Sequence, residues 1–184
     1  GTRVTAASND VFGSDGSRTS LAIDDSSGSS NSFLNLNGTS QSITSLSGDA
    51  TSSIILGDGD EVGSGTLTIG FDSALNPSGI ARADFAGILS GEGTLIKDGP
   101  STQILSGANT FTGATTIDAG TLEITNALGL VATGSASATT VADGATLLVN
   151  GVTISSETLT IAGSGVNSPS GALSGGSSTA SFNG

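Results

Sequence analysis

The sequence predicts an all-β protein in which short strands wind into a coil. Runs of Ile, Leu, Thr and Phe are interrupted every few residues by Gly, often with Ser, Asp or Asn beside it. Such runs are typical of brief strands, and such interruptions are typical of tight turns. The hydrophobic share of 35% and the aromatic share of 3% are too low for a thick interdigitated core. A slender coil with a narrow interior needs fewer apolar residues.

One motif recurs along the chain and supports the coil. It occurs as GTLTI at 65–69, GTLIK at 93–97, GTLEI at 120–124, GATLLV at 144–149 and ETLTI at 157–161. Its leucines are spaced by 28, 27, 25 and 12 residues. The first three intervals have the length of a solenoid repeat, and the last indicates that the motif occupies more than one side of the coil. About seven stacked turns, at ~4.8 Å each, predict a rod roughly 35 Å long.

Strand candidates follow one another from the amino end. The first section, 1–31, contains RVTAA and RTSLAID, and the section 32–56 contains FLNLN, SITSL and SSIIL. In FLNLN the alternation predicts that Leu34 and Leu36 point inward. The segment 126–145 is expected to be a loop with a short strand, and the strand-and-glycine pattern then resumes to the end. The whole chain, 1–184, is therefore expected to form one continuous β-solenoid segment.

Residues two apart in a strand face the same side, which predicts the interior. The expected interior residues are the aliphatic positions of the recurring motif: Leu67, Ile69, Leu95, Leu122, Ile124, Leu147, Leu159 and Ile161. Lys97 occupies the equivalent slot in GTLIK and breaks this pattern. Asn109 and Phe111 are expected to serve a turn and the packing beneath it, because Asn tolerates left-handed backbone and bonds locally.

Charge and composition exclude several classes of function. Sixteen acidic and four basic residues give a net charge of -12. Arg3, Arg18, Arg82 and Lys97 are scattered, so neither nucleic acid nor an anionic membrane surface is expected as a partner. The chain has no Cys, which excludes disulfides and thiolate metal sites. No apolar run is long enough to span a bilayer, so membrane insertion of this segment is not expected.

Two acidic groups are the candidates for chemistry. Asp58, Asp60 and Glu61 offer hard oxygen ligands for Ca²⁺ within 57–65, although a solvated turn explains the same residues without an ion. Asp24 and Asp25 form a possible catalytic carboxylate pair, but neighbours on a strand point to opposite faces. The chain also lacks His, Cys and Tyr, the usual bases and nucleophiles. The prediction is therefore no enzyme, with no catalytic, cofactor-binding or metal-binding residue and no cofactor.

The segment 87–124 carries a family resemblance. GILSGEGTLIKDG, followed by ILSGANTFTGATTIDAGTLEI, resembles the passenger-associated transport repeat, also called the autotransporter-associated β-strand repeat. FLNLNGTSQSITSLSGD at 33–49 and VADGATLLVNGVTI at 141–154 resemble the segments that flank this repeat. Pro100 departs from the family, which usually has a small, flexible residue there. The resemblance implies a right-handed parallel β-helix, exported by type V secretion to the outer cell surface or the exterior.

These observations favour a non-catalytic structural module, a β-helical stalk, spacer or filament segment. Each turn of the coil templates the next, which makes the rod stiff. The alternative is an adhesin whose exposed loops, such as 72–84 or 126–140, bind a cell surface or matrix. A polysaccharide-active enzyme on the same fold is a weaker alternative. Neither end looks like a cap, so the coil is expected to continue into further repeats or to associate end to end.

Overall fold

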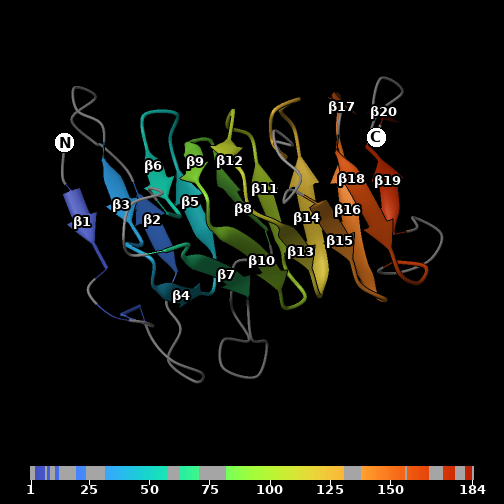
Figure 1. The fold of residues 1–184 in the computed structure, drawn as a ribbon. Coiled ribbons are helices and arrows are strands. Elements are labelled where there is room, and N and C mark those ends of the chain that lie inside the picture. Colours follow the sequence, from blue (N-terminus) through green and yellow to red (C-terminus); the bar gives the residue numbers. More distant parts are fainter. Residues whose placement is uncertain are drawn as a thin grey trace.

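A computed structural model describes residues 3–6, 8, 11–12, 20–23, 32–57, 63–70, 82–130, 138–155, 157–165, 172–176 and 181–183. Within these residues the chain forms twenty short strands and no helix. Figure 1 shows the strands stacked along one direction, from β1 at one end of the stack to β19 at the other, and within each sheet they follow one another in sequence order. The described part contains no helix with the length and apolar character that a membrane crossing requires.

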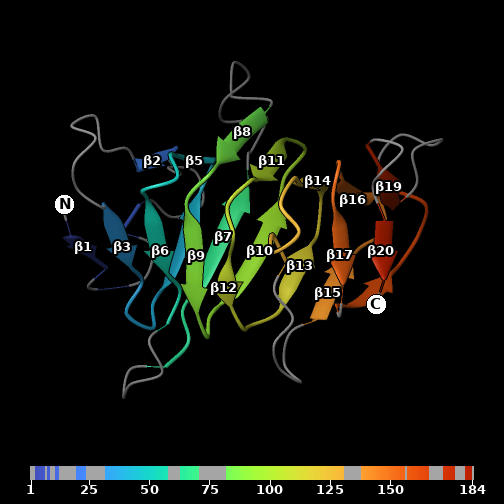
Figure 2. The ribbon, with the colours of Figure 1, turned by 90° about the horizontal axis from the view of Figure 1, so that it is seen from above.

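Three parallel sheets make up the stack, and Figure 2 shows them from above. The first sheet contains β1 (Arg3–Thr5), β3 (Phe33–Asn35), β6 (Ser53–Ile55), β9 (Ile88–Gly91) and β12 (Thr110–Phe111). The second contains β4 (Ser40–Ile43), β7 (Thr66–Gly70), β10 (Thr94–Asp98), β13 (Thr115–Ile117), β15 (Ala138–Val141) and β18 (Thr158–Ile161). The third contains β2 (Leu21–Ile23), β5 (Leu46–Gly48), β8 (Arg82–Phe85), β11 (Thr102–Leu105), β14 (Gly120–Ile124), β16 (Ala145–Val149) and β19 (Leu173–Gly175). A separate pair joins β17 (Thr153–Ser155) to β20 (Ser181–Asn183).

The chain visits the three sheets in a fixed order. In the central region it passes through β9, β10 and β11, one strand in each sheet, and then repeats the circuit through β12, β13 and β14. Every strand pair is parallel, because each circuit returns the chain to the sheet in the same direction. We call one such circuit a coil. This arrangement confirms the predicted parallel β-helix, and the seven-stranded third sheet agrees with the predicted seven turns.

The core is a narrow column of inward side chains. Leu67 and Leu95 pair in register in the second sheet, and Leu122 and Leu147 pair in the third. All four are fully buried, and burying one such side chain contributes about 1.5–3 kcal/mol. The predicted inward residues Leu34 and Leu36 are buried as well. Leu147 and Leu159 lie in different sheets, as the 12-residue interval predicted. The 27-residue interval was expected to be one repeat, but Leu95 and Leu122 also lie in different sheets, and Leu95 pairs with Thr115 in the next coil.

The prediction for the carboxyl end of the motif was wrong in one place. Ile161 was expected inside the coil, but it is 43% exposed, and Leu159 is only partly buried. Both lie on β18, which ends the order of the second sheet. Inward residues on a terminal strand lose the neighbouring coil that would cover them. Position in the stack therefore overrides the local pattern here.

Glycines line one corner of the coil. Gly65, Gly93 and Gly113 each stand at the entry to the second sheet, before β7, β10 and β13. A methyl group on Gly93 would collide with the carbonyl oxygen of Gly65, and one on Gly113 with the carbonyl oxygen of Gly93. We call these three residues the glycine column. It allows successive coils to stack in backbone contact.

Candidate interaction surface

The two acidic groups singled out in the sequence lie outside the described residues. This applies to Asp24 and Asp25, and to Asp58, Asp60 and Glu61 in the possible calcium loop. Of the two candidate adhesive loops, residues 72–81 and 131–137 also lie outside them. Across the described ranges, no group of three or more acidic, His or Cys side chains is arranged to hold a metal ion.

Three amide side chains bridge coils inside the rod. The amide of Gln103 donates to Leu46 O at 2.9 Å and accepts from Leu46 N at 3.1 Å. Asn109 accepts from Leu89 N at 2.9 Å and donates to Gly129 O at 2.8 Å. Gln41 accepts from Val11 N at 2.9 Å and donates to Ser8 O at 2.7 Å. All three amide residues are at most 1% exposed.

Each bridge lies where strand pairing is incomplete. β5 and β8 are in register at Gly48 and Phe85, and Gln103 then satisfies the main chain of Leu46 beyond that pair. Asn109 reaches a turn rather than a strand, because residues 126–130 form turns and bends next to β12. The amides thus replace missing ladder bonds, since a buried main-chain group needs a partner. Asn109 therefore has the expected structural role, but for another reason: its backbone is not left-handed, and its bonds reach residues 20 positions away. Phe111 is 1% exposed and packs in the core.

Lys97, the one break in the motif, lies inside the rod. It pairs in register with Ile69 and Ile117 and is fully buried. Its ammonium group donates to the carbonyl oxygens of Asp98, Gly99 and Ala119 at 2.6, 2.8 and 3.2 Å. Burial lowers the pKa of Lys97 to about 8, and the charge of Asp98 opposes this shift. The lysine therefore ties together two turns between the second and third sheets.

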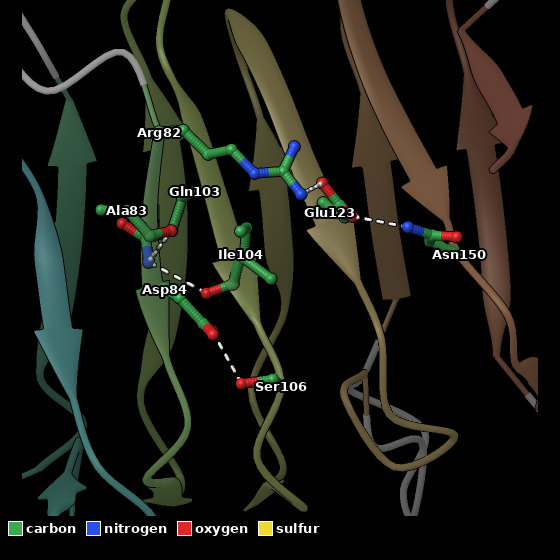
Figure 3. A network of polar contacts seen from close by, with 8 residues as sticks. All are labelled: Arg82, Ala83, Asp84, Gln103, Ile104, Ser106, Glu123 and Asn150. Carbon is green, nitrogen blue, oxygen red and sulfur yellow. Dashed lines mark hydrogen bonds and ion pairs between the residues drawn. The ribbon is translucent and has the colours of Figure 1, made fainter.

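The outer face of the third sheet carries an ion pair, drawn in Figure 3. Arg82 extends from β8 across β11 to Glu123 on β14, with Nη2 2.7 Å from Oε2. The other oxygen, Oε1, accepts from Asn150 at 2.8 Å. Glu123 is 1% exposed, whereas the Arg82 side chain is 57% exposed. This network crosses several coils and engages Arg82, so that arginine is not free for an anionic partner.

The outer face of the second sheet carries mostly uncharged side chains, and Asp98 at the end of β10 is a charged residue on it. One row in register along it consists of Ser42, Thr68, Ile96, Thr116, Thr140 and Thr160. A parallel row includes Ser40, Thr66 and Thr94. All of these side chains are half-buried or exposed. We call these nine residues the hydroxyl face. The alternation in TLTI at 66–69 and 158–161 could have revealed it in the sequence.

Apolar side chains are exposed at both ends of the stack. At the amino end Val4 is 47% exposed, beside a hollow of about 210 Å³ that Phe12, Leu21 and Leu34 also line. At the other end Leu173 is 38% exposed on β19, the last strand of the third sheet. These side chains are of the kind that the coil buries elsewhere. The terminal coils thus offer apolar surfaces suited to further coils.

Asn37 and Gly38 form the turn between β3 and β4. Asn37 has a φ of 52°, and its N–H donates to Asn35 Oδ1 at 2.8 Å. The Thr39 hydroxyl donates to Leu36 O at 2.5 Å. These bonds give the three residues a structural role between β3 and β4.

Comparison with known proteins supports the resemblance seen in the sequence. Residues 95–124 match the model of the passenger-associated-transport-repeat. The chain is also similar to "Adhesin BmaC autotransporter" of Brucella suis biovar 1 (strain 1330), with 38% identity over 98 residues. That alignment covers 53% of this chain and 3% of the adhesin, so the match concerns a small part of the relative. No solved structure matches the chain.

The residues that match the family model lie within the three parallel sheets. Residues 95–124 extend from β10 to β14, within the region from β3 to β14 in which the chain visits the three sheets in a fixed order. Lys97, Gln103 and Asn109 all lie within it, so the repeat contains most of the internal polar bridges. Residues 95–124 thus match a passenger-associated transport repeat, and the chain is an extracellular or outer-surface protein.

Proposed function

We propose that this chain is a non-catalytic spacer, a rigid β-helical segment that holds other parts of a surface protein away from the cell. The observation that carries the proposal is the continuous pairing of the second sheet from β4 to β18. Six strands are hydrogen-bonded in one unbroken order, so the rod has no flexible joint on this side. A rigid rod of stacked coils keeps its two ends at a fixed separation, which is what a spacer requires.

Internal bridges support the same proposal. Gln103 joins residues 57 positions apart in the chain, and Asn109 contacts main chain in the coil on each side of its own. Such bonds connect neighbouring coils independently of the strand ladders. Bending the rod would break them inside an apolar interior, where an unpaired polar group costs about 1–3 kcal/mol.

We propose further that the terminal coils are covered in the working protein, by additional repeats or by a second copy of the chain. The exposed Val4, Ile161 and Leu173 support this, because apolar side chains on a terminal strand promote stacking. Sedimentation of the 184-residue chain tests self-association. Concentration-dependent growth that Ile161→Lys abolishes supports a second copy, and a stable monomer at high concentration counts against it.

The spacer role is tested in the full-length protein displayed on cells. A second copy of residues 96–115, placed directly after Thr115, adds one coil in register and should lengthen the rod by ~4.8 Å. A matched control adds twenty Gly and Ser residues to the exposed turn at Asp143 and Gly144 and should leave the rod length unchanged. The spacer proposal predicts that each added coil moves a distal reporter outward. An unchanged reporter distance with several added coils contradicts it.

An adhesive role is the second candidate, and the hydroxyl face favours it. Although the net charge is -12, the hydroxyl face itself contains no charged residue, so an uncharged surface can approach it. The relative with 38% identity is itself named an adhesin. The test replaces Thr116 and Thr140 with Lys and measures cell attachment, with Thr110→Lys on the first sheet as control. Loss of attachment with the face variants alone, while the rod stays folded, supports adhesion over passive spacing.

A further inference from the structure

Glu157 occupies a position that glycine fills elsewhere in the coil. Gly65, Gly93 and Gly113 stand at the entry to successive strands of the second sheet, and Glu157 stands directly before β18 in the same sheet. At the earlier positions a side chain would collide with the main chain of the preceding coil. The residues directly before β4 and β15 in the sequence are Thr39 and Ser137, so glycine fills this position only at the middle strands. Before the last strand the position holds an ionisable residue.

The carboxyl group of Glu157 is buried, and within the described residues only one of its two oxygens accepts a hydrogen bond. The residue is 4% exposed, and its Oε1 accepts a hydrogen bond from Thr139 Oγ1 at 2.7 Å. Oε2 is also buried and has no hydrogen-bond partner among the residues that the structure describes. Thr139 is itself fully buried and pairs in register with Leu159. The carboxyl group thus lies between the last two coils of the second sheet.

The strands around Glu157 carry no other charge. β13, β15, β17 and β18 contain no Asp, Glu, Lys or Arg. The nearest acidic residue in the sequence is Asp143, which is exposed in the turn between β15 and β16. Arg82 pairs with Glu123, and Lys97 donates to main-chain oxygens from β10, three strands away from β18 in the second sheet. Burial therefore raises the pKa of Glu157, and the bond from Thr139 opposes the shift.

We propose that Glu157 is a proton-controlled latch on the coil formed by β17, β18 and β19. When the carboxyl group is protonated, it is neutral and can stay buried against Thr139. When it is deprotonated, a negative charge with one unpartnered oxygen is held in an apolar interior, which weakens this coil. The coil is therefore tighter in acid and opens more often near neutral pH.

Opening of the latch would uncover the coil beneath. Val141 pairs with Ile161, and Val149 pairs with Gly175, so both valines lie under the last coil. They are at most 2% exposed while that coil is closed. The protonation state of Glu157 thus determines how often apolar side chains and unpaired strand edges are exposed for stacking. This regulation is independent of whether the rod acts as a spacer or as an adhesin.

Hydrogen exchange of the 184-residue chain tests the latch. The quantity is the opening frequency of the β18 amides relative to the β7 amides, each corrected for the intrinsic effect of pH on exchange. β7 contains no ionisable residue, so using it as an internal reference cancels the general effect of titrating the other carboxylates. In the wild-type chain we expect this ratio to be about tenfold higher at pH 7.5 than at pH 4.5, for each unit by which folding raises the pKa.

Two variants and one control complete the experiment. Glu157→Gln keeps the shape without the charge, and Glu157→Gly restores the glycine of the column. In both, the ratio should be the same at the two pH values. Glu123→Gln removes the other buried carboxylate and should leave the pH dependence of β18 intact. A wild-type ratio that does not change with pH, or a pH dependence that persists in Glu157→Gln, would overturn the latch.

Discussion

Gln103 forms two hydrogen bonds with the main chain of Leu46, 57 residues earlier in the chain. The same amide also donates to Ala83 O at 3.3 Å and to Ile104 O at 3.0 Å. One side chain therefore links β5, β8 and β11, three consecutive strands of the third sheet. A polar residue inside this rod substitutes for strand pairing.

Gln103→Leu should destabilise the rod by about 2–4 kcal/mol, because it leaves Leu46 N and O buried without partners. Urea unfolding gives the change in free energy. Thr102→Ala, which alters the adjacent half-buried outward residue, should change stability by less than about 0.5 kcal/mol. Equal effects of the two substitutions would show that the amide bridge contributes nothing.

Gly93→Ala should destabilise the rod by about 1–3 kcal/mol, because the added methyl group overpacks the contact between coils. Gly144→Ala is the matched control. Gly144 has a φ of 78°, so its replacement strains the backbone, but a methyl group there would meet nothing within 4 Å. Thermal unfolding of both variants separates coil contact from backbone strain. A smaller loss for Gly93→Ala than for Gly144→Ala would contradict close stacking at the glycine column.

Lys97 should make stability rise with pH between about 8 and 10.5. In this window the unfolded lysine keeps its proton, whereas the folded one, with a pKa of about 8, loses it. The unfolding free energy should therefore increase by up to about 3 kcal/mol across the window. The chain has no Cys or Tyr and no other Lys to titrate there. Urea unfolding at pH 8 and pH 10.5 measures this, and Lys97→Met should abolish the increase.

Arg82→Ala should destabilise the rod by about 1–3 kcal/mol, because Glu123 stays buried without its cation. The double variant Arg82→Ala with Glu123→Gln should recover part of that loss, since the uncompensated charge is gone. A double-mutant cycle in urea isolates the coupling between the two side chains. A coupling close to zero would mean that the exposed arginine is fully solvated and does not compensate the buried carboxylate.

The repetition of a short motif was enough to predict the coil. TLTI and TLIK are predicted as strands from their alternation. The intervals from Leu67 to Leu95 and from Leu122 to Leu147 each correspond to one coil, whereas the interval from Leu95 to Leu122 does not. The inward leucines follow from the same alternation, because every second residue of a strand faces the core. These features depend on residues that are close together in the chain, so a single sequence is enough to predict them.

Features that depend on the neighbouring coil were missed. The exposure of Ile161 results from the place of β18 at the end of a sheet, which a local pattern does not contain. Gln41 and Gln103 bond to main chain 30 or more residues away, so their partners depend on the register of stacked strands. Glu157 could have been noticed, since ETLTI has Glu where GTLTI, GTLIK and GTLEI have Gly.

The distance between two spin labels tests the central claim, that successive coils stack into a rod, most directly. The chain has no Cys, so Thr51→Cys and Thr153→Cys place labels at two exposed positions on opposite sides of the central repeat. A second copy of residues 96–115, inserted after Thr115, should lengthen the mean distance by ~4.8 Å, one strand spacing. An unchanged distance, with the added residues bulging out as a loop, would contradict the account.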